Sequence, residues 1–127
     1  MIVILDSSAV VEIMRGSEKG EKARKILEIA DVIILPAVVI AELTSYAVRN
    51  GIDTKFVEEI ERNSIVANID SKIAKEAGKY HASRKKIQRG ISLADCTIIA
   101  IADEYGGTII TTDHHFKLYK GKAIIIE

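Results

Sequence analysis

Cysteine and proline are almost absent from the 127-residue chain, in which Cys96 and Pro36 are the only examples. A single cysteine excludes an internal disulfide and a zinc site built from several cysteines, and it is typical of the reducing cytosol. No apolar run approaches the roughly 20 residues that cross a bilayer. Because the sequence also starts without the basic segment and cleavage site of a secretory leader, we expect a cytoplasmic protein that does not enter a membrane.

The chain also has no excess of positive or negative charge, and it has few aromatic side chains. Eighteen basic residues balance eighteen acidic ones, so the overall field attracts no polyanion and nucleic-acid binding must depend on a local patch. Aromatic residues make up 5% of the chain, and we therefore expect base stacking to contribute little. The hydrophobic share of 48%, spread along the whole chain, excludes disorder and favours one globular domain over residues 1–127.

Short apolar runs alternate with helical patterns. The runs are rich in β-branched residues and predict buried strands at residues 2–5, 32–35, 65–69, 108–112 and 123–126. Capping residues and amphipathic spacing predict helices over residues 7–15, 17–30, 36–50, 53–63, 71–86 and 92–105. This order indicates an α/β protein: a three-layer α/β/α sandwich with a mainly parallel central sheet of about five strands. Such sheets bind ligands beyond the carboxyl ends of their strands.

Two acidic residues directly follow predicted strands. Asp6 comes after the apolar run at residues 2–5, and Asp113 comes after the strand predicted at 108–112. The plain alternative for either residue is a cap for the segment that follows. Parallel strands would bring both carboxylates to one edge of the sheet, where the two charges repel unless a cation lies between them.

Asp95 and Glu42 occupy unusual positions on predicted helices. Asp95 opens the most apolar helix, although with Ser92 it also has the spacing of a capping box. Glu42 borders the apolar stripe of its helix, and the alternative is an ordinary exposed acid. Four carboxylates without neighbouring Cys or paired His ligands favour Mg²⁺ or Mn²⁺. Carboxylates that hold such ions serve phosphoryl chemistry.

Four short segments contain these acids. They are Val3-Ile4-Leu5-Asp6-Ser7-Ser8, Ile40-Ala41-Glu42-Leu43, Leu93-Ala94-Asp95-Cys96-Thr97-Ile98 and Thr111-Thr112-Asp113-His114-His115-Phe116. In order and spacing they resemble the four signatures of PIN domains, and the chain is most similar to the single-domain VapC-type toxins of prokaryotic VapBC toxin–antitoxin pairs. The resemblance runs from end to end. Each segment alone is too short to indicate a family, whereas the four segments in this order are specific to one.

The resemblance implies a metal-dependent ribonuclease, an endonuclease that cleaves RNA phosphodiester bonds. It implies that the catalytic acids are Asp6, Glu42, Asp95 and Asp113, with Thr111 as a supporting hydroxyl. The implied metal ligands are Asp6, Asp95 and Asp113, holding one or two Mg²⁺ or Mn²⁺ ions. The implied partners are an RNA substrate, a second copy of the chain in a homodimer, and a cognate antitoxin.

The densest basic cluster lies just before Asp95 and comprises Arg84, Lys85, Lys86 and Arg89. We expect it to form a rim that grips RNA phosphates, the alternative being a solvated helix end. The three histidines, His81, His114 and His115, lack a metal-binding spacing with the cysteine and are assigned to the surface, with contact between the last two and the substrate left open.

Two other functions fit part of the pattern. A phosphoryl-accepting receiver or an aspartyl phosphatase is also an α/β protein with an aspartate after its first strand. Here, however, Asp6 is followed by Ser7 and Ser8 rather than by another acid. The second alternative is a binding module with the PIN-like fold that takes part in RNA processing without catalysing a reaction. Divalent-metal binding together with RNA cleavage would separate the enzyme from such a module.

Overall fold

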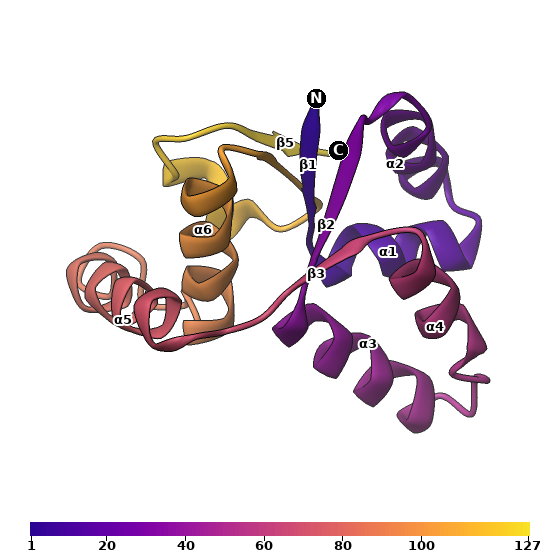
Figure 1. Cartoon of the computed structure of the whole chain (residues 1–127), viewed down its shortest axis with the longest axis horizontal. Helices are drawn as coiled ribbons and strands as arrows, with labels where there is room; N and C mark the ends of the chain where they lie inside the picture. The colour runs from indigo at the N-terminus through magenta and orange to yellow at the C-terminus, as the bar shows by residue number, and fades with distance from the viewer.

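Strands and helices alternate along the chain in the computed structural model, which describes residues 1–127 (Figure 1). The elements are β1 (Ile2–Leu5), α1 (Ser7–Arg15), α2 (Glu18–Ile29), β2 (Val32–Pro36), α3 (Ala37–Arg49), α4 (Lys55–Arg62), β3 (Ile65–Ala67), α5 (Ser71–Arg84), α6 (Leu93–Tyr105), β4 (Thr108–Thr111), the 3₁₀ helix η1 (His114–Leu118) and β5 (Ala123–Ile125). None of the helices combines the length and the apolar composition needed to cross a bilayer.

The five strands form one sheet in the order β3-β2-β1-β4-β5, and every neighbouring pair is parallel. β1 therefore lies in the middle, between β2 and β4. Leu5, the last residue of β1, pairs with Ile110 near the end of β4. This register brings the residues that follow the two strands to the same edge of the sheet.

The two faces of the sheet carry different helices. Successive residues of a strand point to opposite faces, and accordingly Val3 packs in a small cluster with Ala9 of α1 and Ala23 of α2. Ile4 belongs instead to the larger cluster, which includes the buried apolar residues of α6 between Cys96 and Ala102. Figure 1 shows α5 and α6 on one side of the strands and α1 and α2 on the other, which confirms the predicted three-layer α/β/α sandwich.

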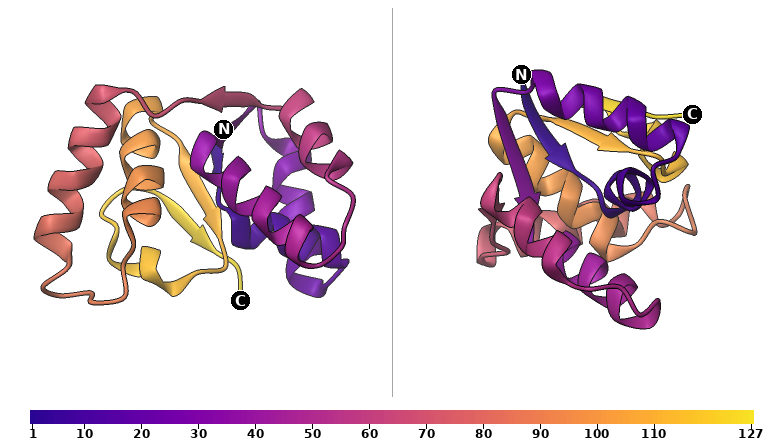
Figure 2. Two further views of the ribbon diagram at one scale, coloured as in Figure 1. Left: turned by 90° about the horizontal axis from the view of Figure 1, so that it is seen from below. Right: turned by 90° about the vertical axis from the view of Figure 1, so that its right-hand side faces the viewer.

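α3 extends beyond the carboxyl edge of the sheet. It begins directly after β2 and packs against both β2 and α1. α3 also contacts α6; seen from below, α3 runs in front of the first strands and α6 stands to the left of β4 and β5 (Figure 2, left). The edge where the acidic residues were expected is therefore flanked by α3 and α6.

Several predicted boundaries differ from the structure. Pro36 is expected in the first turn of a helix, but its extended backbone makes it the last residue of β2, paired with Ala67. The strand predicted to reach residue 69 ends at Ala67, because Asp70 turns away to cap α5 by accepting the N–H of Ile73 at 2.9 Å. The helix predicted to reach residue 86 ends at Arg84, where the chain turns toward α6.

Candidate active site

Asp6 follows β1 and is the only acidic residue that is almost fully buried, with 5% of its surface exposed. Its Oδ2 atom accepts two short hydrogen bonds, one from the Ser8 hydroxyl and one from the Thr111 hydroxyl, both at 2.6 Å. Asp6 stands at the N-cap position of α1, as the predicted alternative requires, but its side chain makes no capping hydrogen bond to the helix and binds the two hydroxyls instead.

The two hydroxyls that hold Asp6 are themselves fixed by backbone groups. The Thr112 N–H donates to Ser8 Oγ at 3.0 Å, and the Asp113 N–H donates to Thr111 Oγ1 at 2.9 Å. Each hydroxyl has one hydrogen to donate, and both hydrogens are directed at Asp6. The other oxygen of Asp6, Oδ1, has no hydrogen-bond partner in the protein. Every buried side-chain nitrogen or oxygen atom has a partner, so Oδ1 must be accessible to solvent.

Asp113 and Asp95 each combine a capping role with a place in the site. Asp113 Oδ1 accepts the His115 N–H at 2.8 Å at the start of η1. Asp95 completes the capping box expected at α6, where Asp95 Oδ2 accepts the Ser92 N–H and Ser92 Oγ accepts the Asp95 N–H, both at 3.0 Å. A carboxylate has a second oxygen and spare lone pairs, so a capping bond leaves ligand capacity in both residues.

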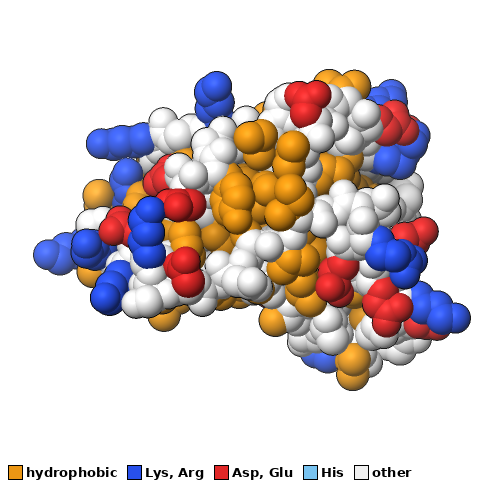
Figure 3. All heavy atoms as spheres, in the orientation of Figure 1, with side chains coloured by type: hydrophobic (Ala, Val, Ile, Leu, Met, Phe, Trp, Pro, Cys, Tyr) orange, Lys and Arg blue, Asp and Glu red, His pale blue; other side chains and the backbone are white.

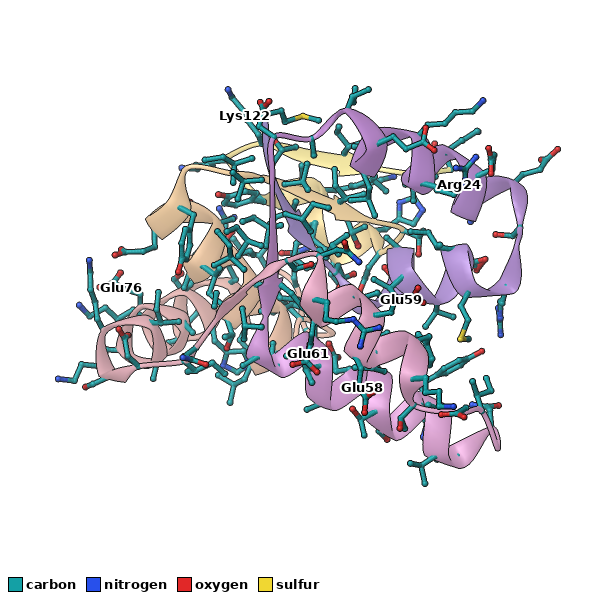
Figure 4. The ribbon with its side chains drawn as sticks, turned by 45° about the vertical axis from the view of Figure 1, so that its right-hand side comes forward. Arg24, Glu58, Glu59, Glu61, Glu76 and Lys122 are labelled. Atoms are coloured by element: carbon teal, nitrogen blue, oxygen red, sulfur yellow. The ribbon has the colours of Figure 1, made fainter.

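Glu42 projects from α3 beside the start of α1. Its Oε1 accepts the Ser7 hydroxyl at 3.2 Å, and its side chain is half-buried. The alternative of an ordinary exposed acid is therefore wrong for Glu42. By contrast, Glu58 and Glu59 of α4 and Glu76 of α5 lie exposed on helix surfaces, as expected (Figure 4).

The electrostatics link the four predicted acids into one site. The pKa of Asp6 is raised mainly by burial, which its two hydroxyl donors oppose and the charges of Asp95 and Asp113 reinforce. The pKa of Glu42 is raised first by burial and then by Asp6, with smaller contributions from Asp95 and Asp113. Burial thus outweighs the like-charge repulsion expected from sequence. Both causes disfavour the ionised carboxylates, and a bound cation would offset both.

His115 adjoins the acids of this site, whereas sequence reasoning placed it on the surface, left open a contact with the substrate and gave it no place among the acids. Its Nδ1 atom lies 3.2 Å from Asp113 Oδ1 and 3.6 Å from Asp95 Oδ2. The available signal was the two-residue spacing from Asp113. His114, by contrast, is exposed, with Nε2 3.7 Å from a carboxylate oxygen of Glu127.

The donor set fits a hard divalent cation. One ligand atom from each of Asp95, Asp113 and His115 can be chosen so that all three lie within 4.8 Å of one another. The charges of Asp95 and Asp113 contribute to the raised pKa of Asp6, and Asp6 presents a free oxygen to solvent. Carboxylate oxygens gathered at one edge of the sheet, with no cysteine among them, are the ligands that Mg²⁺ and Mn²⁺ prefer.

A groove of about 570 Å³ runs from the acidic site between α1 and α3. Ser7, Ser8, Thr112 and Glu42 line the end next to the site, and Tyr46 and Arg49 line the far part. The volume lies in the range of small-molecule and substrate sites in proteins. Arg49 forms no ion pair and donates only to the Ser45 hydroxyl, at 3.2 Å.

The predicted basic rim lies in the segment that joins α5 to α6, and this segment contacts the site. The Gln88 side-chain amide donates to the His115 carbonyl at 3.0 Å. Two of the four basic residues are already engaged: Arg84 stacks 5.3 Å from the ring centre of Tyr80, and Lys85 donates to backbone carbonyls of its own loop. Lys86 and Arg89 are exposed and form no ion pair.

Comparison with known proteins identifies the family and the fold. The family model described as PIN domain matches residues 3–122. The chain is similar to the crystal structure of VapC20 from Mycobacterium tuberculosis, a sarcin-ricin-loop-cleaving toxin, with 15% identity, a TM-score of 0.79, and coverage of 94% of this chain and 95% of that one.

Two further solved structures share the fold over nearly their whole length. A toxin–antitoxin complex from Klebsiella pneumoniae is 16% identical with a TM-score of 0.80, covering 98% of each chain. FitAcB from Neisseria gonorrhoeae is 19% identical with a TM-score of 0.79, covering 96% of each chain. No curated protein sequence matches the chain. At these identities the likeness establishes the fold.

Proposed function

The chain belongs to the PIN-domain family, and from this premise we propose that it is a metal-dependent ribonuclease that cleaves RNA phosphodiester bonds. The observation that carries the proposal is the single acidic site at the carboxyl edge of the sheet, where Asp95 and Asp113 act electrostatically on both Asp6 and Glu42. The likeness to VapC20, a sarcin-ricin-loop-cleaving toxin, supports RNA as the substrate.

Asp6, Asp95 and Asp113 are the proposed ligands of one or two Mg²⁺ or Mn²⁺ ions. When bound, such an ion lowers the pKa of a coordinated water and offsets negative charge on the phosphate. Ser8 and Thr111 both donate to Oδ2 of Asp6 and keep the carboxylate in one orientation, so that Oδ1 would be the oxygen available to an ion. Asp95 and Asp113 are held by the capping bonds of α6 and η1.

Glu42 is proposed to assist by accepting a proton from the attacking water. A carboxyl group with a raised pKa accepts protons more effectively near neutral pH than an ordinary one, and the pKa of Glu42 is raised by burial and by Asp6. The Ser7 hydroxyl orients the Glu42 carboxylate by donating to Oε1. Water reaches this carboxylate through the groove between α1 and α3.

The RNA strand is proposed to cross the acidic edge between two basic positions. On one side lies the loop with Lys86 and Arg89, which adjoins His115 through Gln88. On the other side the groove leads to Arg49. Both sets of cations would contact phosphates, which position the strand without reading its sequence.

The proposed biological role is that of the toxin of a toxin–antitoxin pair, as one cytoplasmic nuclease domain over residues 1–127. Similarity to proteins solved as toxin–antitoxin complexes supports an antitoxin partner. A gathered apolar surface supports a protein partner and a homodimer, because large exposed apolar patches mark interaction sites. Figure 3 shows hydrophobic side chains gathered over the middle of one face, with charged side chains toward both ends.

The test is cleavage of a labelled single-stranded RNA and of an RNA hairpin by the purified protein. We expect cleavage of at least one of them with Mn²⁺ or Mg²⁺ and none with EDTA. Asp6→Asn should abolish cleavage while the protein stays folded by circular dichroism. Glu58→Gln, which removes an exposed acid of α4, is the control and should cleave like the wild type. RNA binding without cleavage under all conditions would identify the silent binding module instead.

A further inference from the structure

We propose that His115 is a direct ligand of the divalent cation and that its imidazole nitrogen makes the site prefer Mn²⁺ to Mg²⁺. The inference rests on the proposed metal site and adds a nitrogen ligand to a set expected to consist of carboxylates alone. Its basis is the position of Nδ1, which lies 3.2 Å from Asp113 Oδ1 and 3.6 Å from Asp95 Oδ2.

These separations match ligands that share one ion. An ion about 2.1–2.2 Å from each ligand atom holds neighbouring ligand atoms about 3 Å apart when they meet at right angles. Asp113 Oδ1 also accepts the His115 N–H, and Asp95 Oδ2 also accepts the Ser92 N–H. Because each carboxylate oxygen has two lone-pair directions, one remains for an ion at both atoms.

Hydrogen bonds fix the backbone of His115, and a loop lies against one edge of its ring. The His115 backbone N–H is bound to Asp113, and the His115 carbonyl accepts the Gln88 side-chain amide at 3.0 Å. Gly90 lies against the far edge of the ring, where a Cβ atom on residue 90 would be only 2.8 Å from Nε2. Nε2 therefore faces the loop and Nδ1 faces the acids, which is the orientation that a ligand shared with Asp113 and Asp95 requires.

A nitrogen ligand changes which ion the site selects. Mg²⁺ binds oxygen donors almost exclusively and holds its water tightly, whereas imidazole is a common ligand of transition-metal ions. With oxygen ligands only, the site would bind Mg²⁺ and Mn²⁺ by the same carboxylates. With His115 included, Mn²⁺ gains a ligand that Mg²⁺ uses poorly.

The decisive measurement is pulsed electron paramagnetic resonance of the RNA-free protein loaded with Mn²⁺. We expect modulation from a directly bound ¹⁴N nucleus, which should change to that of ¹⁵N when the wild type is labelled with ¹⁵N-histidine. His115→Ala should remove the nitrogen signal, and the neighbouring control His114→Ala should keep it. The labelled wild type needs no substitution, so this arm does not depend on a variant that folds.

Binding titrations give the second readout. We expect His115→Ala to weaken Mn²⁺ binding about tenfold or more, the scale of losses seen even for residues that only support metal ligands. Mg²⁺ binding should change much less, so the preference for Mn²⁺ shrinks. Equal losses for both ions, or a nitrogen signal that survives in His115→Ala, would overturn the proposal and leave His115 as a partner of the two carboxylates.

Failure of this inference can be told apart from failure of the proposed function. RNA cleavage together with an absent nitrogen signal overturns the role of His115 alone. A nitrogen signal without RNA cleavage supports the ligand and contradicts the ribonuclease. Absence of Mn²⁺ binding to the wild type overturns both.

Discussion

Thr111 donates its hydroxyl hydrogen to Asp6 across the boundary between β4 and β1, with 2.6 Å between Thr111 Oγ1 and Asp6 Oδ2. The same Thr111 oxygen accepts the Asp113 N–H at 2.9 Å. One fully buried hydroxyl thus connects the acid after β1 to the acid after β4. The relative position of the Asp6 and Asp113 carboxylates therefore depends on the Thr111 hydroxyl as well as on the backbone.

Replacing Thr111 by valine keeps the shape of the side chain and removes both hydrogen bonds. We expect Thr111→Val to lower the free energy of unfolding by about 1–3 kcal/mol, because it takes a donor from a buried acid and leaves the Asp113 N–H without its acceptor. Urea denaturation at neutral pH measures this. Thr108→Val at the other end of β4 is the control, and a loss no larger than that of the control would contradict the prediction.

Removing the charge of Asp6 should stabilise the metal-free protein at high pH. Burial raises the pKa of Asp6 in the folded state above its unfolded value of about 4. The folded protein therefore binds the Asp6 proton more tightly than the unfolded chain, and the resulting stability is complete in acid and lost as pH rises through the raised pKa. Asn can still accept both hydroxyl hydrogens but does not titrate.

Melting temperatures of the wild type and Asp6→Asn in EDTA test this prediction. We expect Asp6→Asn to melt higher than the wild type at pH 8, and the difference to shrink as the pH falls toward 4. Mn²⁺ should raise the melting temperature of the wild type more than that of the variant, because the ion stabilises the charged carboxylate. Glu58→Gln controls for the loss of one negative charge. A variant that melts lower at pH 8 in EDTA would show that Asp6 acts as a structural hydrogen-bond acceptor.

Much of this arrangement follows from local sequence. An acid directly after an apolar run lies at the end of a strand, and parallel pairing then brings Asp6 and Asp113 to one edge. The capping spacing of Ser92 and Asp95 fixes the start of α6, which places Asp95 as well. These positions were predictable because each depends on a few neighbouring residues and on the rule that the strands are parallel.

The remaining parts of the site depend on contacts between distant segments. The Ser8 hydroxyl binds Asp6 and accepts the Thr112 N–H, although Thr112 is 104 positions away in the sequence. His115 is directed at the acids by the loop that contains Gln88 and Gly90. No periodicity or spacing within either segment contains that information.

The basic loop should contribute to RNA binding through two of its four cations. Lys86 and Arg89 are exposed and form no ion pair, whereas Lys85 donates to backbone carbonyls of the loop. Replacing Lys86 and Arg89 by glutamine should weaken binding of a single-stranded RNA. It should also reduce the salt slope, which is the slope of the logarithm of the binding constant against the logarithm of the salt concentration, by about 1.4, at about 0.7 per phosphate contact. Anisotropy titrations at several salt concentrations measure the slope. An equal reduction on replacing Lys19 and Lys25 of α2 would indicate a loss of overall charge rather than a lost contact.

Arg49 should add a separate contact at the far end of the groove. It lies seven residues beyond Glu42 on α3, about 10 Å along the helix axis, a distance that spans a few stacked nucleotides. We expect Arg49→Gln to weaken RNA binding, lower the salt slope by about 0.7 and raise KM more than it lowers kcat. Arg62→Gln on α4, outside the groove, is the charge-matched control. If the two variants bind RNA equally well, the strand does not follow the groove.

Gly90 offers a way to move His115 without replacing it. A Cβ at residue 90 would lie 2.8 Å from His115 Nε2, so in Gly90→Ala the imidazole must shift away from the loop. Because the ring is the end of a partly exposed side chain, we expect little change in the free energy of unfolding but weaker Mn²⁺ binding.

The control is Gly78→Ala in α5, where a new Cβ meets nothing within 4 Å. That substitution should stabilise the protein by about 0.5–1 kcal/mol through helix propensity and leave Mn²⁺ binding unchanged. Calorimetric Mn²⁺ titrations and urea denaturation of both variants measure the two effects, and unaltered Mn²⁺ binding in Gly90→Ala would mean that the position of the ring does not matter to the ion.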